Sequence, residues 1–108
     1  MDRLAMLEKM VAGGSQDPFV RYGLAMEYRR LGRLAEASRA FDDLLAVKPD
    51  YLATYLMAGG VLATQQQKDR AHEVYSRGIA VARSQGNAKT LGELESALAE
   101  LGLEEDEG

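Results

Sequence analysis

Apolar side chains recur every three or four residues along most of this chain of 108 residues, which is the spacing of amphipathic helices. The clearest stretch is 18–49, where two periodic segments meet at Gly32. Glycine allows a sharp turn there because it reaches positive φ at little steric cost. Pro49 ends the second segment because proline disfavours helical geometry in the residue before it. The pattern predicts a helical hairpin with helices over about 18–31 and 34–47.

The same spacing predicts four further helices, over about 2–12, 51–64, 69–84 and 88–101. Asp2 and Asp17 are expected to cap the first two helices of the chain. Gly59 and Gly60 stand inside a predicted helix, where each costs about 1 kcal/mol relative to alanine. This pair predicts that another backbone packs very close. Gly102 is expected to end the last helix, and residues 104–108 are expected to form a disordered acidic tail.

Shifting the sequence by 34 residues brings the hairpin onto a second copy of itself, with Ala37 on Ala71 and Phe41 on Tyr75. A repeat of this length with small and aromatic residues in register indicates stacked helical hairpins. On these positions the chain resembles the tetratricopeptide repeat (TPR) family. The family motif in residues 18–51 is carried by Leu24, Ala25, Tyr28, Gly32, Ala37, Phe41 and Pro49. Residues 52–85 depart from it, because Gln66 replaces the turn glycine and Arg83 the final proline.

The resemblance implies an all-α fold of TPR-like helical hairpin repeats. We expect a single domain over residues 1–103, with two central repeats at about 18–51 and 52–85. A leading helix precedes them, and a capping helix at about 88–101 follows them, since a repeat array needs a polar-backed end. Residues 104–108 remain outside this domain as the acidic tail.

The net charge of −4 lies wholly in the second half of the chain, where five basic residues stand against nine acidic ones. A negative protein is a poor candidate for binding phosphate backbones, so we expect no nucleic-acid partner. The chain has no cysteine, no segment of the roughly 20 apolar residues that a membrane span needs, and no signal-peptide pattern at its start. These absences favour a cytoplasmic protein without a membrane partner.

The sequence contains no constellation that predicts catalysis, a metal site or a cofactor. His72 is the only histidine, and no activated nucleophile or paired acid is placed with it. We interpret it as a surface residue, and we predict that the protein is not an enzyme.

The helix over 18–31 carries apolar residues on two faces. Leu24, Tyr28 and Leu31 form one stripe and are expected to pack inside the hairpin. The second face needs another explanation. In the TPR family the corresponding face lines a concave groove that holds a peptide or a partner helix. By resemblance, the groove would be lined by Phe19, Tyr22, Met26 and Leu56, with Arg29 and Arg30 towards one end.

The resemblance therefore implies a protein-interaction module whose ligand is mainly apolar. Two alternatives stay open. A terminal helix of the chain covers this face, or the face pairs two copies of the chain in a homodimer. Arg29, Arg30 and Arg33 cluster at the hairpin turn and are either a solvated helix end or a contact site for an acidic group of a partner.

Overall fold

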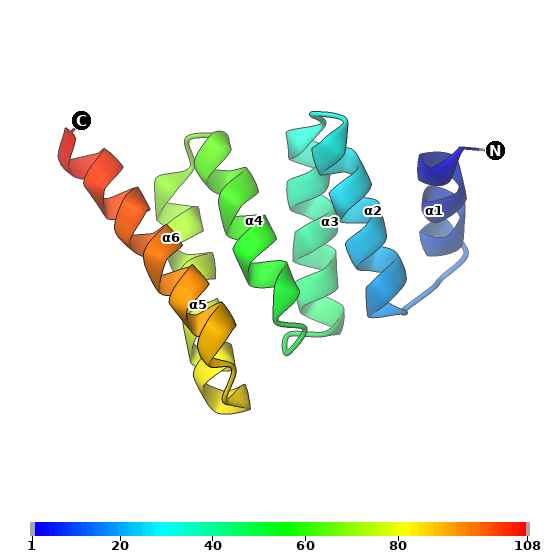
Figure 1. Cartoon of the computed structure of the whole chain (residues 1–108). Helices are drawn as coiled ribbons and strands as arrows, with labels where there is room; N and C mark the ends of the chain where they lie inside the picture. The colour runs from blue at the N-terminus through cyan, green and yellow to red at the C-terminus, as the bar shows by residue number, and fades with distance from the viewer. Residues whose placement is uncertain (1, 108) are drawn as a thin grey trace. The chain divides into compact units, whose positions relative to one another are not determined.

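The computed structural model of the chain describes residues 2–107, with side chains through residue 102 (Figure 1). The described residues form six α-helices and no strand, which confirms the all-α prediction. Along the chain, a leading helix is followed by two central hairpins and a capping helix, as predicted. The helices are α1 (Arg3–Ala12), α2 (Pro18–Arg30), α3 (Leu34–Val47), α4 (Ala53–Thr64), α5 (Lys68–Gln85) and α6 (Ala88–Glu107).

The helices form two compact units, the first over Met1–Thr54 and the second over Tyr55–Gly108. The predicted organisation as a single domain over residues 1–103 stays a prediction. No helix in the described part of the chain combines the length and the apolar character needed to cross a membrane.

The starts of α1 and α2 and the turn between α2 and α3 follow the sequence signals. Asp2 Oδ1 accepts a hydrogen bond from the backbone N–H of Ala5 at 2.7 Å, and Asp17 Oδ1 accepts one from that of Phe19 at 2.9 Å. Each carboxylate satisfies a backbone donor that has no partner inside the helix. Gly32 has a φ of 76°, so the turn between α2 and α3 uses the left-handed conformation that glycine was predicted to supply.

The core of the first unit lies where α2 packs against α3. The fully buried residues of this core are Ala25, Ala37, Phe41 and Leu44. The prediction was wrong for Leu31, which is 44% exposed and is the residue that caps the C-terminus of α2. The packed stripe ends with Tyr28, because the chain leaves the helix one turn later.

Helix α1 is fastened to α2 by one apolar and two polar contacts. Leu7 is buried and lies against Gly23, where an added Cβ would be 3.7 Å from the leucine methyl. Arg3 Nε pairs with Glu27 Oε2 at 3.2 Å. The hydroxyl of Tyr28 donates to Glu8 Oε2 at 2.5 Å. Helix α1 therefore meets α2 through residues 23, 27 and 28.

The bond from Tyr28 to Glu8 predicts a loss of stability at alkaline pH. Burial, and next the hydrogen bond to Glu8, raise the pKa of Tyr28 from 10.0 to about 12. The neutral phenol thus stabilises the fold fully below pH 10, and this contribution is lost as the pH rises from 10 to 12. We expect Tyr28→Phe to unfold more easily at neutral pH, by about 1–2 kcal/mol, and to lose less stability over that window. Urea unfolding at several pH values measures both, and equal alkaline slopes for the two proteins would contradict the assignment.

The hairpin of the second unit is built on two contacts between a tyrosine and a glycine. A Cβ added to Gly59 would lie 2.6 Å from Cδ1 of Tyr75, which is shorter than van der Waals contact and would be a steric clash. On α5, a Cβ added to Gly78 would lie 2.5 Å from Cβ of Tyr55. Both tyrosines are buried. The close approach predicted at Gly59 and Gly60 is therefore found at Gly59 alone, and the group that approaches is an aromatic ring rather than another backbone. A Cβ added to Gly60 would lie 4.0 Å from the Tyr75 hydroxyl.

The turn between α4 and α5 places Gln66 at a φ of 65°, the one non-glycine residue with positive φ in the described part of the chain. This conformation costs a side-chain-bearing residue about 1–2 kcal/mol. We therefore expect Gln66→Gly to raise the free energy of unfolding by about 1 kcal/mol, despite the greater freedom of glycine in the unfolded chain. The reciprocal change, Gly32→Gln, should lower the free energy of unfolding by a similar amount. Denaturant titrations of both variants measure these changes. A destabilising Gln66→Gly would show that the turn is not strained.

Helix α6 is longer than predicted. Gly86 ends α5 with a φ of 67°, and Asn87 Oδ1 accepts from the backbone N–H of Thr90 at 3.0 Å to start α6. Leu94 and Leu101 anchor α6 with exposures of 0% and 3%. The helix does not end at Gly102, which lacks a positive φ, but continues to Glu107. The good helix formers that follow this glycine explain the extension. Most of the predicted tail is thus helical backbone, and Gly108 lies outside the described residues.

Candidate functional site

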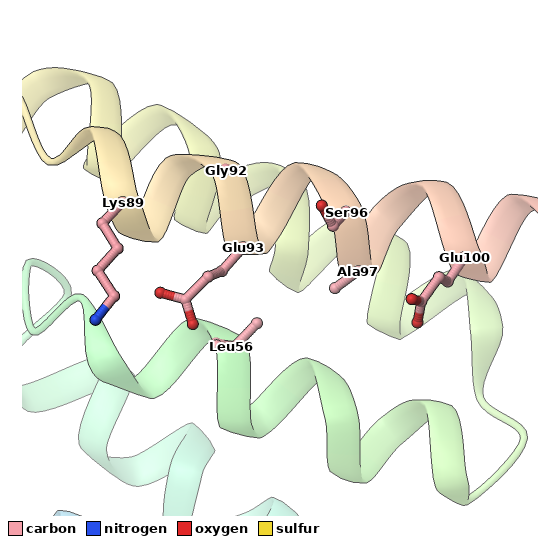
Figure 2. Close-up of a pocket in the computed structure, with 7 residues that line it drawn as sticks. All are labelled: Leu56, Lys89, Gly92, Glu93, Ser96, Ala97 and Glu100. Carbon is pink, nitrogen blue, oxygen red and sulfur yellow. The ribbon is translucent and has the colours of Figure 1, made fainter.

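A groove of about 610 Å³ lies between α4 and α6 in the second unit (Figure 2). Its lining comes almost entirely from one face of α6, with Leu56 contributed by α4. The lining residues are Leu56, Lys89, Gly92, Glu93, Ser96, Ala97 and Glu100. Helix α6 therefore forms a wall of this groove and does not cover it.

The groove stays open because small residues stand at its centre. A Cβ added to Gly92 would meet nothing within 4 Å, so no described atom of the protein fills the space beside it. Ala97 follows five residues later on the same wall. Leu56 is half-buried and reaches from α4 towards α6 in Figure 2. The result is an apolar strip with accessible backbone on one side.

The α6 wall is charged, which differs from the mainly apolar groove that the sequence predicted. Lys89, Glu93 and Glu100 are exposed, and Figure 2 shows Lys89 and Glu93 projecting from α6 towards α4. Among the side chains described through residue 102, no ion pair involves these three residues. Glu95, by contrast, lies 3.8 Å from Arg83 of α5 and outside the groove.

On α2, in the first unit, the second apolar face is partly free. Phe19 is 72% exposed, although it stands at the start of the helix beside the capping Asp17. Met26 is half-buried. The hydrogen bond, the ion pair and the leucine contact from α1 reach residues 23, 27 and 28 of α2, and the exposure of Phe19 shows that α1 does not cover its ring. The alternative in which the N-terminal helix covers this face is therefore wrong for Phe19.

Tyr22 is held by two other rings of the same unit. Its ring centroid lies 6.2 Å from that of Phe41 in an edge-on arrangement and 5.8 Å from that of Tyr51. Burial raises the pKa of the Tyr22 phenol, and Tyr51 adds to the rise, while Arg29 lowers it. Tyr22 thus belongs in part to the packing of the hairpin, and replacing it would disturb the fold as well as the surface.

The three arginines at the hairpin turn differ in their partners. Arg30 Nε donates to Glu27 Oε1 at 2.6 Å. Arg33 donates twice to Glu36, at 2.7 and 2.8 Å, and these bonds hold the pKa of the Glu36 carboxyl below its ordinary value. Arg29 is exposed. Because Arg30 and Arg33 are engaged within the chain, Arg29 is the strongest candidate of the three for contact with a partner.

The predicted site residues thus belong to two different units of the chain. Phe19, Tyr22, Met26, Arg29 and Arg30 belong to α2 of the first unit, while Leu56 belongs to the groove of the second. That all six line one continuous groove stays a prediction.

Sequence reasoning missed the α6 wall, because that helix was interpreted only as a cap with one apolar face. A signal was present. A further shift by 34 residues places Tyr55 on Lys89, Gly59 on Glu93 and Leu62 on Ser96. These positions of α6 correspond to the residues with which α4 packs, and polar residues occupy them. Helix α6 can therefore be recognised from the sequence as the first helix of an incomplete repeat with an open face.

No group of three or more potential metal-ligating residues occurs among the described residues. His72 is exposed on α5, as predicted for a surface residue.

Comparison with solved structures places the chain among helical-repeat proteins. The crystal structure of a tetratricopeptide repeat domain protein from Salinibacter ruber matches this chain with a TM-score of 0.75. The two sequences are 36% identical, and the match covers 80% of this chain and 97% of that one. Its solution structure gives 38% identity and a TM-score of 0.77 over 82% and 91%. A Bordetella parapertussis protein is 25% identical, with a TM-score of 0.82 over 96% and 90%.

The TPR2B domain of yeast Sti1, solved in a complex with pHsp70, shares the fold with a TM-score of 0.85 over 94% of this chain and 81% of that one. Its identity is 12%, so the likeness concerns the fold alone. No protein-family model matches the chain, and no curated protein sequence matches it.

Proposed function

Because the chain belongs to the tetratricopeptide repeat family, we propose that it is a non-catalytic module that binds a peptide or helix of a partner protein. The observation that carries the proposal is the open groove beside Leu56, where small residues leave space that none of the side chains described through residue 102 fills. The complex of the Sti1 domain is in keeping with a protein ligand for this fold. The proposed location is the cytoplasm, and neither a nucleic acid nor a membrane is proposed as a partner.

The exposed face of α2 is proposed as a second contact surface. Phe19 offers an unusually exposed aromatic ring, and Met26 offers an adaptable apolar side chain about two turns further along the same face of α2. Arg29 would add a cation at one end. Tyr22 supports this surface through its contacts with Phe41 and Tyr51.

The test is capture of proteins from an extract of the source cells by the intact chain and three variants. Leu56→Lys places a charge in the groove, and Phe19→Ala with Met26→Lys removes apolar area and adds a charge on α2. An unpaired charge is costly when a partner covers it and cheap in solvated protein. His72→Lys adds the same charge at an exposed position of α5 and serves as the matched control.

We expect the control to retain the same partner as the intact chain, and at least one of the surface variants to lose it while keeping its helical circular-dichroism spectrum. An identical set of captured proteins for all four chains would contradict the proposal.

Self-association is the second candidate function, favoured by α1. Met6 and Met10 are 49% and 44% exposed, and their spacing of four residues puts them on one face of the helix. Sedimentation velocity at several concentrations tests this alternative. A dimer that becomes a monomer in Met6→Lys with Met10→Lys would favour a structural homo-oligomer, whereas a monomer at all concentrations would exclude it.

A further inference from the structure

We propose that the groove between α4 and α6 selects a cationic helix of its partner, with two basic side chains seven residues apart. This inference rests on the proposed function and names the chemistry of its ligand. It follows from the charges on the α6 wall, from their spacing, and from the open strip between them.

The two carboxylates of the wall set the spacing. Glu93 and Glu100 are seven residues apart on α6, which corresponds to about 10.5 Å along a helix axis. Both line the groove, both are exposed, and neither has an ion-pair partner among the side chains described through residue 102. Basic residues at positions i and i+7 of a partner helix repeat the same distance, so one ligand helix can place a cation at each carboxylate.

Lys89 sets the direction of the ligand. It lines the groove one turn before Glu93, so the wall presents one cation followed by two anions. A complementary helix carries an acidic residue four positions from the first of its two basic residues. The same helix in the opposite direction would bring a basic side chain to Lys89, which like-charge repulsion disfavours.

The middle of the groove selects small or aliphatic residues. Gly92, Ser96 and Ala97 lie on the α6 wall and Leu56 lies opposite, so the lining between the charged positions consists of small residues and one leucine. Small residues at the contact let two helices approach closely, which gives dispersion contacts that a bulky wall would prevent.

The charge of the whole unit acts in the same direction. The part of the chain from 55 onwards holds five basic and nine acidic residues, whereas the part before it is balanced at eight of each. A net negative field steers a cationic ligand towards this unit and speeds its association. The first unit offers no such preference, which makes the second unit the expected site for a basic partner.

The experiment uses the whole chain and a labelled alanine-rich helical peptide whose binding face reads Glu-x3-Lys-x6-Lys with leucine between the charges. Three comparison peptides of the same length are used: one with glutamine at the charged positions, one with every charge reversed, and one of the same composition in scrambled order. Fluorescence anisotropy at low and at physiological salt gives the dissociation constants. We expect the designed peptide to bind at least about tenfold more tightly than the other three, with a preference that narrows as salt screens the charges.

Two variants locate the binding. Glu93→Gln with Glu100→Gln should weaken the designed peptide about tenfold, whereas the matched pair Glu73→Gln with Glu95→Gln removes the same net charge outside the groove and should have little effect. Gly92→Leu should abolish binding by filling the strip. We expect it to keep the fold, which its helical circular-dichroism spectrum checks, because no described atom lies within 4 Å of the added Cβ.

The outcomes separate this inference from the function on which it rests. If the neutral or the charge-reversed peptide binds as tightly as the designed peptide, and Gly92→Leu weakens that binding, the groove is a binding site but its proposed preference for a cationic helix is wrong. Should none of the peptides bind, or Gly92→Leu leave binding unchanged, the inference is overturned. The interaction module itself is judged independently, by whether capture of the native partner depends on Leu56 or on the Phe19 and Met26 face.

Discussion

Replacing Phe41 with alanine is expected to lower the free energy of unfolding by about 3–5 kcal/mol. The ring is 0% exposed and lies in the core between α2 and α3, edge-on to Tyr22. Its removal takes apolar surface out of the core and leaves a cavity that two packed helices cannot close fully. Since a domain of this size is stable by only about 5–15 kcal/mol, urea unfolding should show a large shift of the midpoint or a protein unfolded at the outset.

The other of the two phenylalanines in the chain, Phe19, serves as the control for Phe41. Phe19 is 72% exposed, so Phe19→Ala should change stability by no more than about 0.5 kcal/mol. A loss below about 1 kcal/mol at Phe41, or equal losses at the two positions, would mean that the assignment of the core is wrong.

The features that sequence reasoning predicted correctly depend on local chemistry. The capping carboxylates of Asp2 and Asp17 act on backbone groups two or three residues away. The turn at Gly32 needs a positive φ angle, which glycine adopts at little steric cost. Such features can be predicted from the sequence because the residue and the backbone group that it affects are close together in the chain. The 34-residue register extends them, since a repeated hairpin repeats the same local solution.

The features that it missed depend on which side chains meet across elements. Gly59 signals a close approach, but nothing near it in the sequence says that the approaching group is the ring of Tyr75. Leu31 continues the apolar stripe of α2 in sequence, yet the helix has already ended there. Gln66 adopts the positive φ expected of glycine, because the packing of α4 against α5 fixes the geometry of the turn that joins them.

The candidate site shows the same division. Leu56 was predicted from the repeat register, and the structure places it in a groove. The opposite wall was missed, because Lys89, Glu93 and Glu100 were interpreted as the solvated back of an amphipathic cap and the 34-residue shift was not carried into α6. Only the placement of α4 beside that face turns ordinary surface charges into the lining of a groove (Figure 2).

Replacing Tyr75 with alanine is expected to cost about 3–5 kcal/mol and to reverse the effect of a second substitution, Gly59→Ala. In the intact chain the alanine methyl would overlap the Tyr75 ring, so Gly59→Ala should be destabilising by about 1–3 kcal/mol despite the better helix propensity of alanine. Once the ring is absent, that methyl enters the vacated space. Gly59→Ala should then be neutral or stabilising by up to about 1 kcal/mol.

The double-mutant cycle needs four proteins that fold, so the urea titrations are made in a constant concentration of a stabilising osmolyte such as trimethylamine N-oxide. Gly92→Ala serves as the control glycine, because an added Cβ there meets nothing within 4 Å. It should stabilise α6 by about 1 kcal/mol with or without the Tyr75 ring. The cycle between Gly59 and Tyr75 should instead give a coupling of about 2–3 kcal/mol. Equal effects of Gly59→Ala in the two backgrounds would show that the ring does not rest on the glycine, and the contact that joins α4 to α5 would have to be reassigned.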